Sequence, residues 1–468
     1  MTAQAVARTG ATGAVAASFG VGLVIASGRP ELALAALLFC AGLLLVGRPG
    51  VVLALLLGTT ILVEGDRQGF LASAAQFYVP IAPPFLLSDL VFCLLLVAVL
   101  FDVRTRGLEF RTPGRLTLPL VLLGTAVAIG SVTGYLDGAA GSDIVGSVRV
   151  LAYLVLLPFA VVNVVRTDDD VRRVVIAAGL FAIFKGAEGT VAWLAGEGRP
   201  FGGTTLTYYE PATNALMLAF LLTVAAAALN RAPLHRWVWL GTLPVAAALL
   251  LSFRRSFWIA AVLGLVLVLL LSRSPTRKLL LLAVVSVVGA AVLAISNGGG
   301  TESRTTGGVA ERVKSLGPGR IQSTSEDRYR LVEQRNVVAA LRENPITGLG
   351  LGVPWEVRYP LPERHEDDTL YTHVVAFWFW LKLGLAGLVS YLLLMATAIR
   401  SSYRISRLHP DPLLASAGLG LVATLSGLMV AETTGSFTGV SLRFTILLAA
   451  LLGTLAAAER ALQRTAST

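Results

Sequence analysis

Charge and cysteine are both scarce in this chain of 468 residues. Charged residues make up 14% of the sequence and hydrophobic residues 55%, a balance too apolar for a water-soluble domain to cover its surface with polar groups. The two cysteines, Cys40 and Cys93, lie inside apolar runs, where a lone thiol is usually a small buried hydrophobe. These shortages argue against a soluble enzyme, a disulfide scaffold and a thiolate metal site.

The charge that is present is mainly positive. The formal net charge is +10, which in a soluble protein would suggest a nucleic-acid partner. Here the positive residues cluster in short loops between apolar runs, which is the usual bias of membrane proteins. We therefore expect membrane lipid rather than nucleic acid around this chain.

Apolar runs close to the length that spans a bilayer recur along the whole sequence. They predict an all-α integral membrane protein with about fourteen transmembrane helices, the first of which inserts and is not cleaved. The expected spans are about 10–27, 31–47, 49–64, 87–103, 116–134, 149–165, 174–196, 212–229, 237–252, 256–271, 279–296, 373–398, 412–433 and 440–458.

These spans divide the chain into three parts. Residues 1–296 hold transmembrane helices 1–11, residues 297–372 form one large hydrophilic loop, and residues 373–468 hold helices 12–14 and the C-terminus. Alternate short loops are rich in arginine, which predicts that they and the C-terminus are cytoplasmic and that the large loop is extracytoplasmic. The arginines that set this orientation are Arg104, Arg106, Arg111, Arg115, Arg166, Arg172, Arg173, Arg231, Arg236, Arg273, Arg277, Arg400, Arg404, Arg407, Arg460 and Arg464.

The large loop begins with a Gly-rich linker and then predicts a helix over about 325–343. Glu326 and Asp327 suit the N-terminus of a helix, and Asn344 followed by Pro345 ends it. At 100° per residue, one face carries Arg330, Gln334, Val337 and Leu341, and the other carries Arg328, Arg335 and Arg342.

Two groups of arginine residues are candidate anion ligands. Arg254 and Arg255 lie between two apolar spans on the predicted outer side. They either extend toward lipid headgroups or bind a lipid diphosphate, whose oxygens suit the planar guanidinium group. Arg330 is open to the same two interpretations, as an interfacial cation or as a ligand that faces the apolar side of its helix.

His373 opens the span that follows the large loop. It is either an amphipathic interfacial residue or a group that takes a proton from a hydroxyl, since histidine titrates near neutral pH. His365 lies in an acidic run that is irregularly spaced for a metal site, so a solvated loop is the preferred interpretation.

Ionisable residues inside or at the ends of spans are further candidates, because charge in lipid is costly. Lys185 and Glu188 lie three residues apart on one helix, and we expect them to neutralise one another. The remaining four are left without a predicted role: Lys382, Glu432, Arg443 and Asp89.

The run SEDRYRLVEQRNVVAALRENPITGLGLG, a polar loop and then YTHVVAFWFWLKLGLAG together resemble the O-antigen ligase and polymerase superfamily, the WaaL and Wzy-type glycosyltransferases. The resemblance covers most of the chain, because the same features follow in the same order. These are many helices, a large loop late in the sequence, and a histidine that opens the next span. It implies that His373 is catalytic and that Arg254 or Arg255 binds diphosphate with the arginine of the loop helix. Many relatives carry tryptophan four residues after that arginine, where this chain has Gln334, so Arg330 and Arg328 are alternatives.

The resemblance also implies an activity. The donor would be an undecaprenyl-diphosphate-linked glycan, and the acceptor a sugar hydroxyl on a glycan or lipid-linked carrier, at the outer face of a bacterial inner membrane. The reaction would invert the anomeric centre, as polymerase or ligase, without metal or other cofactor, and a chain-length regulator is an implied protein partner. The alternatives are a flippase for lipid-linked oligosaccharides or another transporter, and a non-catalytic scaffold of envelope assembly.

Overall fold

The computed structural model describes residues 45–63, 80–82, 85–197, 199–201, 204–206, 210–272, 278–279, 325–361 and 369–467. Helices dominate this part of the chain, and the strands form only two short antiparallel pairs. The expected span at 10–27, nearly all of 279–296, most of 31–47, the Gly-rich linker and His365 lie outside the described residues.

The first half of the described chain contains five α-helices. The elements are α3 (Pro49–Leu62), β1 (Pro80–Ala82), β2 (Phe85–Leu86), α4 (Leu87–Thr105), the 3₁₀ turn η2 (Gly114–Leu116), α5 (Thr117–Leu136), α6 (Gly141–Val164), α7 (Asp168–Leu194), β3 (Arg199–Phe201) and β4 (Thr204–Leu206). The second half contains α8 (Pro211–Asn230), α9 (Arg236–Leu251), α10 (Arg255–Leu271), α13 (Ser325–Glu343), α14 (Val375–Leu408), α15 (Pro412–Ala431) and α16 (Leu442–Ser467).

Seven helices of the described chain are long and apolar enough to cross a membrane: α5 with η2, α6, α7, α8, α14, α15 and α16. Three more apolar helices are shorter, namely α3, α9 and α10. The 16 residues of α9 extend about 24 Å at 1.5 Å per residue, less than a hydrocarbon core of about 30 Å. The chain is thus a multi-pass membrane protein, whereas the predicted total of fourteen crossings stays a prediction.

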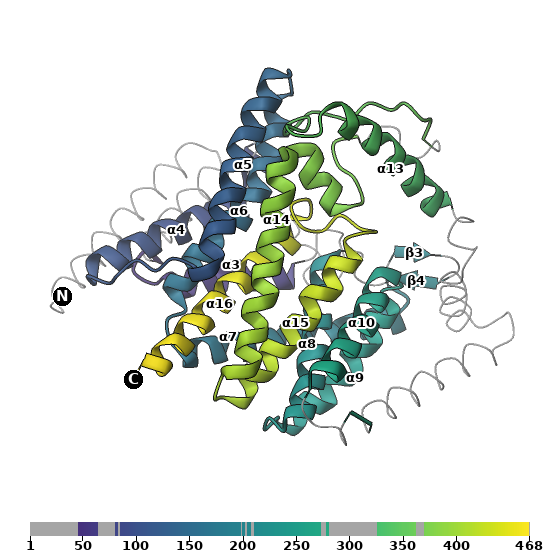
Figure 1. Ribbon diagram of the computed structural model, residues 1–468. Helices are drawn as coiled ribbons and strands as arrows, with labels where there is room; N and C mark the ends of the chain where they lie inside the picture. Colours follow the sequence, from purple (N-terminus) through teal and green to yellow (C-terminus); the bar gives the residue numbers. More distant parts are fainter. Residues whose placement is uncertain are drawn as a thin grey trace, which may run out of the picture.

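The bundle has two chemically different ends, and α13 lies over one of them (Figure 1). Arginine-rich loops meet at one end, where Arg172 lies 3.9 Å from Asp411, Arg404 3.5 Å from Glu459, and Arg460 donates to Thr112. We call this the arginine end. The helix α13 packs at the other end, against the start of α14, and we call this the α13 end.

The helix α14 is broken at Gly384, although its hydropathy predicts one continuous span. Gly384 has φ 65° and ψ −168°, a conformation open essentially to glycine alone. The segment that follows α13 fills the break: Leu349 N donates to Leu381 O at 2.6 Å, and Leu385 N donates to Ile346 O at 2.9 Å. Leu351 N donates to Gly130 O of α5 at 2.9 Å. The glycines of the ENPITGLGLG run therefore let this backbone lie directly against two helices.

We predict that Gly384→Ala destabilises the fold, because a Cβ there would overlap the carbonyl oxygen of Ile346 and alanine would be strained at this φ by about 1–3 kcal/mol. Gly146→Ala in α6 is the control, since its added Cβ meets nothing within 4 Å. Thermal unfolding in detergent should show a lower Tm for the first variant and an unchanged or higher Tm for the second. Equal values for both would contradict the role given to Gly384.

Candidate functional site

One face of α13 packs onto the start of α14 and onto the segment 353–361. Val337 and Leu341 are buried there with Trp355, Leu361 and Leu381. The arginines of the opposite face, Arg328, Arg335 and Arg342, are exposed, and they share one face as the helical periodicity predicted. The packing therefore fixes the rotation of α13 about its axis, and with it the direction in which each polar residue projects.

Asn336 holds the segment beyond α13 against that helix. Its side-chain oxygen accepts from Arg358 N at 2.8 Å and Tyr359 N at 2.7 Å, and its nitrogen donates to Tyr359 O at 2.9 Å and Val332 O at 3.2 Å. This uses both donors and both acceptor positions of a side chain that has no exposed surface. A hydrogen bond from Arg358 to Glu343 adds to the attachment, and together with the bond to Glu356 it raises the pKa of Arg358.

Glu333 and His373 form a pair at the centre of this contact. The Nδ1 atom of His373 lies 3.1 Å from both carboxylate oxygens of Glu333, and the His373 backbone N donates to Oε2 at 3.1 Å. The Glu333 side chain is fully buried, whereas 20% of the His373 side chain is exposed. One carboxylate thus fixes both the ring and the backbone of the histidine.

The neighbours of His373 restrict its ring further. Tyr329 meets the ring edge-on, with centroids 5.7 Å apart, and Tyr371 lies at 5.4 Å. Trp355 holds the backbone just before His373 in place. Its Nε1 donates to Tyr371 O at 2.9 Å, and its backbone N donates to Thr369 O at 3.1 Å. With Nδ1–H donated to Glu333, Nε2 is left as the nitrogen that can accept a proton.

Sequence reasoning selected His373 but missed Glu333. The available signal was the helical stripe Tyr329, Glu333, Val337 and Leu341, in which each residue lies four after the last. An acid inside an otherwise buried stripe requires a partner. The predicted face was centred on Arg330 instead, which is 60° away from Glu333 on the helix.

The structure distinguishes the two candidate arginines of α13. Arg330 is half-buried with its Nε atom inside the protein, whereas Arg328 is exposed. At 100° per residue, Arg330 lies 60° from Glu333 around the helix, whereas Arg328 lies 140° away. Burial and direction therefore separate the two arginines.

Arg254 and Arg255 lie in the turn that joins α9 to α10. Phe253 adopts a positive φ of 50° there, and Arg254 is the N-cap of α10. Both side chains are half-buried, and the Nε atom of Arg254 is buried. The turn is held by Trp258, whose Nε1 donates to Leu249 O at 3.2 Å.

A short series of contacts connects α10 to the start of α14. Phe257 in the first turn of α10 stacks on Phe437 at 5.3 Å, which belongs to the connection between α15 and α16. In the same connection, the backbone oxygen of Glu432 accepts from Val375 N at 3.1 Å, two residues after His373. These contacts hold the turn with Arg254 and Arg255 at the α13 end. Phe437 and Glu432 connect this turn to the start of α14, which directly follows His373.

The ionisable residues inside the bundle have structural partners. Lys185 pairs with Glu188, as expected, and both are buried. Asp89 accepts from Leu86 N at 2.8 Å and from the Tyr153 hydroxyl at 3.1 Å. The other partners are Val353 O for Lys382, Tyr391 and Thr438 for Glu432, and Glu210 and Thr60 O for Arg443.

The stretch that carries all the candidate residues also has a family match. Residues 240–392 match the family model described as O-antigen ligase. This confirms the resemblance to the O-antigen ligase and polymerase superfamily, whose members are glycosyl-transferring enzymes in general. The matched residues cover most of α9, all of α10 and α13, and the first part of α14. No curated protein matches the chain by sequence.

We predict that Asn336→Ala frees the segment at Arg358 and Tyr359 from α13, because both backbone amides lose the oxygen that accepts them. Losing a buried hydrogen-bond partner costs about 1–3 kcal/mol, so these two amides should exchange with deuterium at least roughly tenfold faster. Arg335→Ala on the exposed face of the same helix is the control. Unchanged exchange at both amides in Asn336→Ala would show that other contacts hold the segment.

Proposed function

We propose that this chain is a membrane glycosyltransferase that moves a glycan from an undecaprenyl-diphosphate donor to an acceptor sugar hydroxyl, as an O-antigen or exopolysaccharide polymerase or ligase. The observation that carries the proposal is the buried Glu333 carboxylate that fixes His373 within the O-antigen ligase match. A histidine oriented by a buried acid is a recurrent arrangement for taking a proton from a hydroxyl.

In the proposed reaction, Nε2 of His373 accepts the proton of the acceptor hydroxyl. The hydroxyl oxygen then attacks the anomeric carbon, and the bond from that carbon to the diphosphate oxygen breaks. Attack from the face opposite the diphosphate inverts the anomeric centre. Glu333 acts through His373: it orients the ring and stabilises the imidazolium that forms.

The leaving diphosphate gains negative charge as the bond breaks. Arg330, with Arg254 and Arg255, would stabilise this charge, because fixed cations in a partly dry site need little reorganisation when charge develops. Arg328 stays the alternative to Arg330, although its exposure suits a headgroup contact better. These groups supply both proton transfer and charge stabilisation, so the proposal includes no metal and no other cofactor.

The proposed setting is the inner membrane of a bacterium, with the α13 end facing the periplasm or outside. The gathering of arginine-rich loops at the other end supports this orientation. The donor and a carrier-linked acceptor would then meet at the outer face. A chain-length regulator stays a predicted partner.

We predict that His373→Ala and Glu333→Gln both reduce glycan transfer by the purified protein from a polyprenyl-diphosphate donor, the first by about 10²-fold or more. Full rates in both variants would refute the assignment.

We predict that Arg330→Gln lowers the transfer rate by about 10²-fold, whereas Arg328→Gln on the exposed face retains most of it. The two substitutions are chemically identical and lie two residues apart on one helix, so each controls for the other. The reverse ranking would reassign the ligand to Arg328. If the wild type moves the lipid between leaflets without transferring glycan, the enzyme proposal is replaced by the flippase alternative.

We predict that a cysteine on α13 is accessible from outside the cell. In a chain with Cys40 and Cys93 replaced by alanine, Arg342→Cys should react with a membrane-impermeant maleimide in intact cells. Arg173→Cys at the arginine end should react only after lysis. The opposite labelling pattern would invert the proposed orientation.

A further inference from the structure

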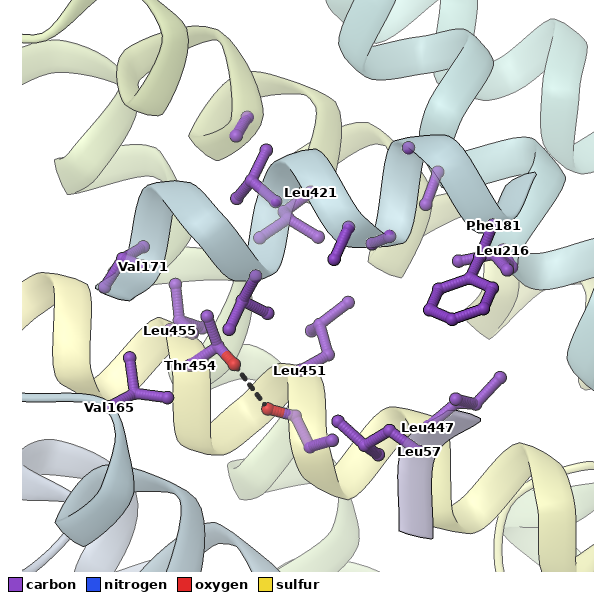
Figure 2. A pocket seen from close by; sticks show the side chains of 18 of the residues that line it. Leu57, Val165, Val171, Phe181, Leu216, Leu421, Leu447, Leu451, Thr454 and Leu455 are labelled. Atoms are coloured by element: carbon purple, nitrogen blue, oxygen red, sulfur yellow. Dashed lines mark hydrogen bonds between the residues drawn. The ribbon is translucent and has the colours of Figure 1, made fainter. Parts of the chain in front are cut away.

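A cavity of about 720 Å³ lies among the helices α3, α7, α8, α15 and α16. Each helix contributes a stripe of residues at helical spacing, such as Ala212, Ala215, Leu216, Ala219 and Phe220 of α8. Figure 2 shows Leu216, Leu421, Leu447 and Leu451 around its interior. The cavity therefore runs along the helices rather than across one end of the bundle.

The cavity walls are mainly hydrocarbon and provide few hydrogen-bond donors or acceptors. The hydroxyl of Thr454 donates to Ala450 O at 2.9 Å within its own helix (Figure 2), and that of Thr424 donates to Gly420 O at 2.7 Å. A buried water needs two to four polar partners. Apolar cavities of only about 150 Å³ stay dry and bind benzene, so this larger space suits an apolar ligand.

A buried ion pair closes the cavity at the α13 end. Its lining there includes Ile61, Ala212 and Phe444. Directly beyond them, Arg443 pairs with Glu210 and donates from Nε to Thr60 O at 2.9 Å. The side chain of Arg443 is only 3% exposed. A ligand in the cavity therefore cannot place a polar group at this end without breaking a buried ion pair.

The arginine end of the cavity is different, because Arg173 there is open to solvent. Its lining includes Asp170 and Arg173, together with Leu455 and Ala458 of α16. The Arg173 side chain is 78% exposed and lies 3.4 Å from Asp170, and exposed pairs of this kind are weak. Its guanidinium can therefore turn toward a phosphate at the mouth.

We propose that this cavity binds an acyl chain of an anionic phospholipid, with its phosphate beside Arg173. The lining of α16 extends from Phe444 to Ala458, which corresponds to about 21 Å at 1.5 Å per residue, the length of one extended chain. The headgroup would lie in the leaflet at the arginine end. The lipid is therefore distinct from the proposed donor, whose diphosphate belongs at the α13 end.

Native mass spectrometry of the purified full chain tests the proposal. Wild type should retain one phospholipid, and Ala178→Phe in α7 and Ala219→Phe in α8, on different walls of the cavity, should each lower its occupancy at least tenfold. Ala187→Phe is the matched control, because Ala187 is an exposed alanine of α7 outside the lining. A variant that does not elute as a single peak is replaced by the leucine substitution at the same position.

The headgroup is tested in nanodiscs that contain phosphatidylglycerol and phosphatidylcholine in equal amounts. Wild type should enrich phosphatidylglycerol, and Arg173→Gln should lose the enrichment while still carrying a lipid. The proposal is overturned if wild type carries no phospholipid, if both cavity variants retain it, if Arg173→Gln keeps the enrichment, or if the bound mass is a polyprenyl phosphate. Glycan transfer is assayed on the same preparations, so failure of the proposed function is seen separately.

Discussion

The arrangement of the α13 end depends on the requirement that backbone N–H and C=O groups inside a membrane find partners within the protein. Gly384 breaks α14 and leaves groups at Leu381 and Leu385 without their helical partners. The segment from Ile346 to Leu351 supplies partners to both and also bonds to α5. Because this segment directly follows α13, the same hydrogen bonds that complete α14 also place Glu333 over His373.

Polar groups are distributed unevenly along the bundle, and this distribution connects its parts. Buried charges at the α13 end are paired or hydrogen-bonded to backbone, as Arg443 and Lys382 show. Arginine-rich loops occupy the opposite end, and the space between the helices is lined by hydrocarbon. A diphosphate would meet fixed, partly dry cations at one end, whereas a phospholipid headgroup would meet flexible, hydrated ones at the other.

Much of the α13 end could be predicted from local sequence. The structure has α13 at Ser325–Glu343, the range that its acidic start and the Asn344–Pro345 stop indicated. Exposure of Arg328, Arg335 and Arg342 followed from the helical period. Glu333 was missed because an acid on a charged helix is normally solvated. Its place in the stripe with Tyr329 and Val337 indicated burial, but only the structure shows that His373 is its partner.

The break in α14 could not be predicted for a related reason. Hydropathy continues through Gly384, and a single glycine is tolerated in a helix, so only the inserted segment from another part of the chain reveals the break. The total of fourteen crossings stays a prediction, because α3, α9 and α10 are apolar yet short. Long-range backbone partners, rather than composition, decide the break in α14.

Glu333 and His373 are separated by 40 positions in the chain, and this spacing has a consequence for biosynthesis. Neither residue is correctly placed until α13 has emerged, folded and docked on a span that is synthesised after it. A partly inserted chain therefore holds a histidine that Glu333 has not yet oriented. The proposed activity would begin only when membrane insertion of this region is complete.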